Sequence, residues 1–191
     1  MTRYLALGDS YTIGEGVEPA QTWPYLLAQA RGWSTPQVIA RTGWTADELL
    51  AAMDGAAPSG PFDAVSVLVG VNDQYRGREV AEHLPFFNRV LTRAVALADG
   101  DTQRVFVVSI PDWGLTPFGA GDRRGRAAIS GAIDDYNAAQ AELCAMRGLR
   151  YVDITPLTRE LAADTAMLVH DRLHPSGAQY ARWAQLIAAA L

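Results

Sequence analysis

Short apolar runs alternate with longer helical patterns along the whole chain, and this alternation most constrains the fold. The runs that read as strands cover residues 3–8, 37–41, 63–69, 104–110 and 149–154. The third and fourth are nearly continuous in Val, Ile, Leu and Phe, which is typical of strands covered on both faces. Strands that alternate with helices predict βαβ units with right-handed crossovers. We therefore expect an α/β fold: a three-layer α/β/α arrangement with a five-stranded parallel sheet.

Helical spacing of apolar residues predicts the elements between these strands. The expected helices cover residues 22–31, 47–53, 79–98, 124–147 and the stretch from Ser176 to Leu191. Thr45 and Ser176 are side chains of the type that caps a helix N-terminus. The turn-rich stretch 54–61 is expected to be a loop.

Size and charge limit the function classes. A chain of 191 residues suits one domain over residues 1–191, with a substantial core. The net charge is −5 and no basic stripe is present, so we expect no nucleic-acid partner. No apolar run approaches the roughly 20 residues of a membrane-spanning helix, and the N-terminal run is too short for a signal-peptide core. We therefore expect a cytoplasmic protein, and the sequence carries no signal for an oligomeric state.

Cys144 is the only cysteine, so no intrachain disulfide can form. It stands in an apolar helical pattern, which predicts a buried, unreactive thiol. His83 fits an early helix turn, and a surface position or a hydrogen-bonded core position is the expected role.

Polar residues follow three of the predicted strands, at the edge where ligands bind in an open parallel sheet. Ser10 follows the first strand within Gly8-Asp9-Ser10, Gly43 follows the second, and Asn72 follows the third. Taken singly, each fits ordinary turn or cap chemistry. Together they offer a nucleophile and oxyanion donors at one edge.

A carboxylate and a histidine stand three residues apart near the C-terminus, as Asp171 and His174. At that spacing the carboxylate can reach the imidazole from the same turn, fix its tautomer and stabilise its protonated form. The D-x-x-H pattern alone is frequent by chance and also describes a surface histidine beside an incidental acid. With a serine at the sheet edge, the pair supplies a general base and its orienting acid.

These blocks resemble the SGNH-hydrolase superfamily, also called GDSL esterases and lipases. Ser10 in GDSYTIGEG, Gly43, Asn72 in GVND and His174 in DRLHPSG match the four family blocks in order, from residue 4 to about 180. The resemblance implies a flavodoxin-like fold, no cofactor and hydrolysis of acyl esters, thioesters or related compounds. It implies Ser10 as nucleophile, His174 as base and Asp171 as its orienting acid. The N–H groups of Ser10 and Gly43 and the Asn72 side chain would form the oxyanion hole.

One position departs from the family name, because Tyr11 stands where GDSL has leucine. We expect this difference to alter the shape of the substrate pocket and not the membership in the hydrolase superfamily. The side chains expected to line a substrate pocket come from the loops at the same edge: Tyr11, Trp44, Val71, Tyr75, Arg76, Trp113 and Phe118. The rings of Trp113 and Phe118 could equally anchor their loop onto the core.

Two substrate classes and one non-enzymatic role remain open at this point. Small acyl esters, thioesters or lysophospholipids would use a narrow apolar groove, whereas acetylated carbohydrates would stack on Trp44 and Trp113. A non-catalytic binding module on the same fold would have no use for a general base. The G-x-S-x-G elbow and the phosphate-binding loop are both absent. A metal cluster of His170, Asp171 and His174 is less favoured than the hydrolase interpretation, so we expect no metal site.

Overall fold

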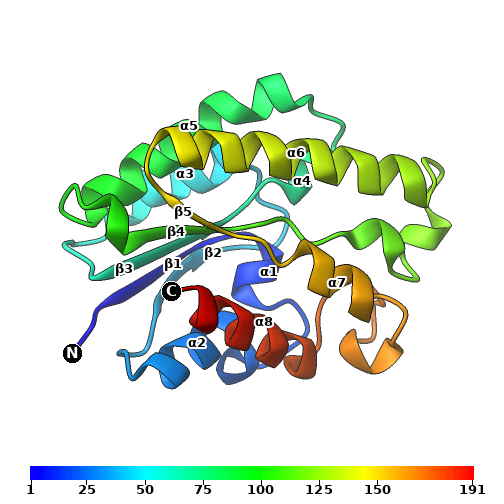
Figure 1. Cartoon of the computed structure of the whole chain (residues 1–191), viewed down its shortest axis with the longest axis horizontal. Helices are drawn as coiled ribbons and strands as arrows, with labels where there is room; N and C mark the ends of the chain where they lie inside the picture. The colour runs from blue at the N-terminus through cyan, green and yellow to red at the C-terminus, as the bar shows by residue number, and fades with distance from the viewer.

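The computed structural model describes all 191 residues and shows a parallel sheet between two layers of helices (Figure 1). Its strands are β1 (Tyr4–Gly8), β2 (Gln37–Ala40), β3 (Ala64–Leu68), β4 (Val105–Val108) and β5 (Arg150–Val152). The strand order is β2-β1-β3-β4-β5, and every pairing is parallel. The predicted three-layer α/β fold with five parallel strands is therefore confirmed.

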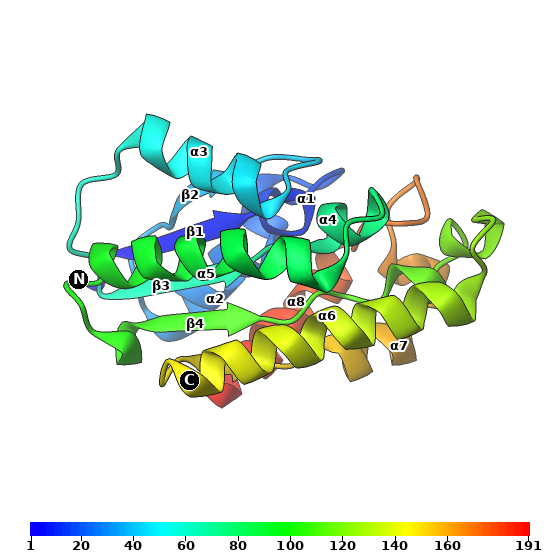
Figure 2. The ribbon, with the colours of Figure 1, turned by 90° about the horizontal axis from the view of Figure 1, so that it is seen from above.

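Helices cover both faces of the sheet (Figures 1 and 2). One layer holds α3 (Ala46–Ala56), α5 (Val80–Leu97) and α6 (Arg126–Met146), and the other holds α2 (Trp23–Arg31) and α8 (Gly177–Ala190). Successive side chains of a strand point to opposite faces. Tyr4 and Ala6 of β1 therefore belong to one buried cluster, whereas Leu5 and Leu7 belong to the other.

Helix ends follow the capping rules at two predicted positions. Thr45 precedes α3, where its N–H donates to Glu48 Oε2 at 2.9 Å. Ser176 precedes α8 and its hydroxyl accepts from the Gln179 N–H. The predicted end of α3 at residue 53 is wrong, because the helix continues through Ala56. A glycine near the last turn costs only about 1 kcal/mol relative to alanine, so Gly55 does not stop the helix.

Three helices were not expected from the sequence: α1 (Ser10–Ile13), α4 (Val71–Tyr75) and α7 (Thr155–Leu161). Each is too short to show an apolar period. Both α1 and α4 begin directly beyond the carboxyl ends of β1 and β3, at the same edge of the sheet (Figure 2). This edge carries the polar residues singled out above. None of the helices is both long and apolar enough to cross a bilayer.

Candidate active site

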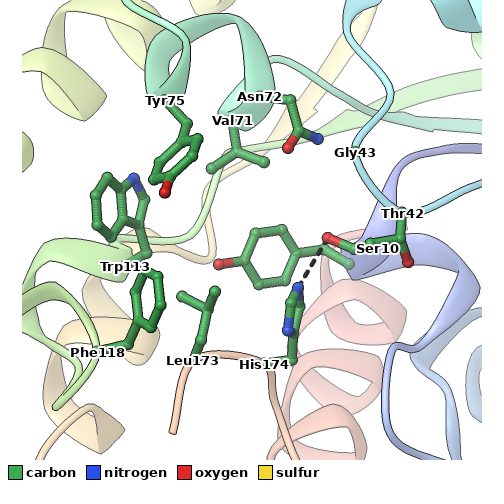
Figure 3. A pocket seen from close by; sticks show the side chains of 11 residues that line it. Ser10, Thr42, Gly43, Val71, Asn72, Tyr75, Trp113, Phe118, Leu173 and His174 are labelled. Atoms are coloured by element: carbon green, nitrogen blue, oxygen red, sulfur yellow. Dashed lines mark hydrogen bonds between the residues drawn. The ribbon is translucent and has the colours of Figure 1, made fainter. Parts of the chain in front are cut away.

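Hydrogen bonds join Ser10 to His174 and His174 to Asp171, although Ser10 and His174 lie 164 residues apart in the sequence. The bond between His174 and Ser10 is drawn in Figure 3. His174 Nε2 lies 3.0 Å from Ser10 Oγ, and His174 Nδ1 lies 2.6 Å from Asp171 Oδ2. A carboxylate can only accept, so Nδ1 carries the proton and donates to Asp171. Nε2 is then free to accept the proton of the Ser10 hydroxyl.

The turn before α8 fixes the Asp171 carboxylate. Its other oxygen, Oδ1, accepts from the N–H groups of Leu173 at 2.8 Å and His174 at 3.0 Å. Partial burial opposes ionisation, but the hydrogen bonds from the His174 ring and from these two N–H groups outweigh it. The pKa of Asp171 is therefore held below its ordinary value. The carboxylate stays charged and keeps the His174 ring in the tautomer that faces Ser10.

Asp9 lies fully buried directly before Ser10 and caps the short helix α1. Its Oδ1 accepts from the Tyr11 N–H at 3.0 Å, while Oδ2 has no hydrogen-bond partner in the protein. Burial raises the pKa of Asp9 to about 8, and the nearby carboxylate of Asp73 acts in the same direction. Below that pH Asp9 is a neutral acid beneath the Ser10 turn.

The raised pKa of Asp9 predicts a pH-dependent stability. Between its usual pKa of 3.8 and about 8, the folded chain holds one proton more at this site than the unfolded chain. The free energy of unfolding should therefore fall as pH rises through this window, by up to about 1.4 kcal/mol per pH unit from this group. Asp9→Asn keeps the cap but cannot lose a proton, so its stability relative to the wild type should rise from pH 5 to pH 8. Urea unfolding curves at four pH values measure this, and a constant difference between the two proteins would contradict it.

Two residues that line the cavity have backbone N–H groups with no acceptor in the protein. They are Ser10, at the start of α1, and Gly43, in the loop after β2. Gly43 has a φ of +88°, a conformation that favours glycine. A Cβ built there would meet nothing nearer than Arg76 Nη2 at 3.8 Å, so the side-chain position of Gly43 is open. Both residues line the same cavity as Ser10 Oγ.

Asn72, on α4, lies at the same end of the cavity as Ser10 (Figure 3). Its Nδ2 donates one proton to the Trp44 carbonyl at 2.9 Å. An amide nitrogen carries two protons, so the second remains for a group in the cavity. Ser10, Gly43 and Asn72 together can therefore offer three donors to one developing negative charge.

Helix α4 holds the loop of Gly43 through main-chain atoms. Arg76 Nη2 donates to the Gly43 carbonyl at 2.6 Å, Asn72 donates to that of Trp44, and Asp73 Oδ2 accepts from the Ala46 N–H at 3.0 Å. Trp44 and Arg76, also predicted to line the pocket, are not among the residues that line the cavity of Ser10. The Trp44 ring packs against a core cluster and the Arg76 guanidinium is occupied by the Gly43 carbonyl and Glu48.

The cavity has a volume of about 210 Å³. Its lining consists of Ser10, Tyr11, Thr42, Gly43, Val71, Asn72, Tyr75, Trp113, Phe118, Leu173 and His174. The other five predicted pocket residues are in this set. Sequence reasoning missed Thr42 and Leu173, and the only available signal was that each directly precedes a motif residue.

Three aromatic rings form the end of the cavity away from Ser10 (Figure 3). Trp113 lies between the other two, with ring centroids 5.4 Å from Tyr75 and 6.1 Å from Phe118. Trp113 is only 2% exposed, and its Nε1 donates to Gln74 Oε1 at 3.0 Å. Trp113 thus both anchors its loop and lines the cavity, while Phe118 is 42% exposed at the mouth.

Two residues considered for chemistry lie in the core. His83 is fully buried on α5, with Nε2 3.0 Å from Gln140 Nε2, and Cys144 is fully buried on α6. Burial raises the pKa of the Cys144 thiol to about 12, which fits the expected unreactive thiol. No three side chains of His, Cys, Asp or Glu come together in a way that could hold a metal ion.

The sequence profile of the GDSL-like Lipase/Acylhydrolase family matches residues 6–182. Among curated proteins, no sequence relative was found.

Solved structures share the fold at low sequence identity. The psychrotrophic esterase EstA from Pseudoalteromonas sp. superposes with a TM-score of 0.75 at 15% identity, over 100% of this chain and 96% of the other. A lipase/acylhydrolase from Enterococcus faecalis gives 0.68 at 22% identity, over 99% and 94%. The acetyl xylan esterase AlAXEase gives 0.74 at 17% identity, over 99% of each chain.

Proposed function

The chain belongs to the GDSL-like lipase/acylhydrolase family, whose members hydrolyse ester bonds, and from this premise we propose that it is a serine esterase for short- to medium-chain acyl esters. The observation that carries the proposal is the chain of hydrogen bonds from Asp171 through His174 to Ser10. Ser10 and His174 line a mostly apolar cavity of about 210 Å³. Small thioesters and lysophospholipids carry the same acyl chemistry and are included in this class.

The proposed reaction passes through an acyl-enzyme. Ser10 Oγ attacks the acyl carbon while His174 Nε2 takes the hydroxyl proton, and Asp171 stabilises the imidazolium that results. The N–H groups of Ser10 and Gly43 and the Asn72 amide bind the oxyanion. His174 then gives its proton to the leaving alcohol. Water, deprotonated by His174, attacks the acyl group in turn and releases the carboxylic acid, and Ser10 regains its proton.

The geometry favours acyl chains over carbohydrates as the recognised group. The carbohydrate alternative needs exposed Trp44 and Trp113 rings as a stacking platform. Trp44 lies outside the cavity, and Trp113 is enclosed by Tyr75, Phe118 and its bond to Gln74. Apolar side chains such as Val71 and Leu173 complete a lining suited to hydrocarbon.

The direct test is hydrolysis of p-nitrophenyl esters from acetate to long acyl chains, with acetylated xylan as the competing substrate. We expect turnover of the acyl esters and covalent labelling of Ser10 by a fluorophosphonate probe. Labelling at another residue would refute the assignment of Ser10. Efficient acetate release from xylan, with poor turnover of every simple ester, would replace the proposal by the carbohydrate alternative.

Removal of the Asn72 side chain tests the oxyanion hole. We expect Asn72→Ala to lower kcat by about 10²–10³-fold with KM little changed, because the lost donor acts mainly in the transition state. Asn88→Ala, which removes an exposed asparagine on α5, serves as the matched control. Initial rates with p-nitrophenyl butyrate measure the effect, and a thermal melt checks the loop contact to Trp44. Unchanged turnover in Asn72→Ala would exclude Asn72 from the mechanism.

A further inference from the structure

Tyr75 belongs to two cavities at once. It lines the far end of the cavity that holds Ser10, and it also lines a second, more open cavity of about 560 Å³. The other residues around the second cavity are Arg76, Gly77, Asp122, Arg123 and Arg124. No other residue is shared, so Tyr75 is the partition between the two spaces. Tyr75 is 48% exposed, so no other side chain covers its outer face completely.

Arg124 holds this partition in place from the outside. Its guanidinium carbon lies 5.2 Å from the ring centroid of Tyr75 and 5.0 Å from that of Trp113. Arg124 Nη1 also donates to the Tyr75 carbonyl at 3.2 Å. Two further nitrogens bind the Asp122 carboxylate, each at 2.9 Å. The guanidinium thus lies over two aromatic rings and binds both oxygens of a carboxylate at the same time, a combination that the point charge of a lysine ammonium does not reproduce.

The volume of the cavity beside Ser10 sets a scale for the length of the acyl group. An apolar cavity of about 150 Å³ accommodates a ligand the size of benzene, which has six carbons. About 210 Å³ therefore accommodates an acyl chain of roughly six to eight carbons. A longer chain directed away from Ser10 meets Tyr75, and the second cavity begins directly behind that ring.

We propose that Tyr75, clamped by Arg124, closes the far end of the acyl cavity and sets the longest acyl chain that the enzyme hydrolyses well. This inference rests on the proposed esterase function and adds its specificity-determining residues. Loss of the Tyr75 ring would join the two cavities into one channel. Loss of Arg124 would keep the Tyr75 ring but remove the contacts that hold it, so the ring could rotate away from the cavity.

The experiment compares kcat/KM for p-nitrophenyl esters of two to sixteen carbons. The proteins are the wild type, Tyr75→Ala, Tyr75→Phe, Phe118→Ala, Arg124→Ala and Arg124→Lys. The matched control is Arg123→Ala, because the neighbouring Arg124 and not Arg123 lies over the two rings. We expect the wild type to fall at least about tenfold between octanoate and dodecanoate, since single methylenes in apolar pockets discriminate by about 10-fold or more. The dodecanoate-to-butyrate ratio should rise about tenfold in Tyr75→Ala and less in Arg124→Ala. Tyr75→Phe and Arg123→Ala should keep the wild-type ratio, and Arg124→Lys should restore it only in part.

The experiment distinguishes a wrong role for Tyr75 and Arg124 from a wrong assignment of esterase activity. If the wild type hydrolyses short esters but both Tyr75→Ala and Arg124→Ala keep its ratio, the partition does not limit chain length. A changed ratio in Phe118→Ala alone would move the limit to the mouth of the cavity and overturn the inference. If the wild type hydrolyses no ester and no probe labels Ser10, the proposed function itself fails. Both Tyr75 and Arg124 lie at the surface, so at least one truncated variant is expected to fold.

Discussion

Ser10→Ala is expected to lower kcat by about 10⁶-fold, the scale at which removal of a serine nucleophile leaves only binding and oxyanion stabilisation. The alanine methyl cannot form the acyl-enzyme, so His174 would have to activate water on a substrate positioned for serine attack. KM should change little, because Ser10 contributes one small group to a lining of eleven residues. The rate with p-nitrophenyl butyrate and the covalent mass after probe treatment measure the effect.

Ser59→Ala, an exposed loop serine, is the matched control for that experiment and should retain wild-type turnover. Thermal melts of both variants establish that each is folded. Full activity in folded Ser10→Ala would show that Ser10 is not the nucleophile, and the mechanism above would be abandoned.

Asp171→Ala is the variant with the second-largest expected effect, a loss of about 10⁴-fold in kcat. The imidazole of His174 would remain near Ser10, but without a carboxylate to fix its tautomer or stabilise its positive charge. Some base activity therefore survives, and the loss stays smaller than that of Ser10→Ala. The measurement is the same esterase assay over a pH series, with Asp135→Ala on α6 as an exposed-acid control.

The Asp171 carboxylate also accepts from two backbone N–H groups, so its removal loosens the turn that presents His174. Asp171→Asn separates the two effects, because the amide oxygen can still accept from that turn while the carboxylate charge is lost. A loss in folded Asp171→Ala equal to that in Ser10→Ala would contradict the expected ranking. Wild-type turnover in Asp171→Asn would show that the carboxylate charge does not contribute to catalysis.

The layered fold could be predicted because buried parallel strands leave a strong sequence signal. All five strands lie where their apolar runs indicated, and their carboxyl ends bring Ser10, Gly43 and Asn72 to one edge. The contact between Ser10 and His174 spans 164 positions, and the order of the motifs was enough to predict it. The short helices α1 and α4 were not predictable, since four or five residues hold little more than one helical period.

Side-chain directions in the loops could not be predicted, because tertiary partners decide them. Trp44 and Arg76 stand at the correct edge in sequence but take other partners, a core cluster and the Gly43 carbonyl. The double role of Trp113 depends on a buried acceptor, Gln74, that lies 39 residues away. No local pattern carries this information.

The hydrogen bonds from α4 and Arg76 to the Gly43 loop show which residues of the sequence specify the shape of this loop. Asn72, Asp73 and Arg76 bind only its peptide groups, which every residue type supplies. Part of what fixes this loop is thus encoded some thirty positions downstream, in addition to the conformation of Gly43 and the contact of Thr45 with Glu48. A graft of this segment into another scaffold would need α4 as well, whereas Thr42 and Trp44 could be exchanged for other residues without loss of these three bonds.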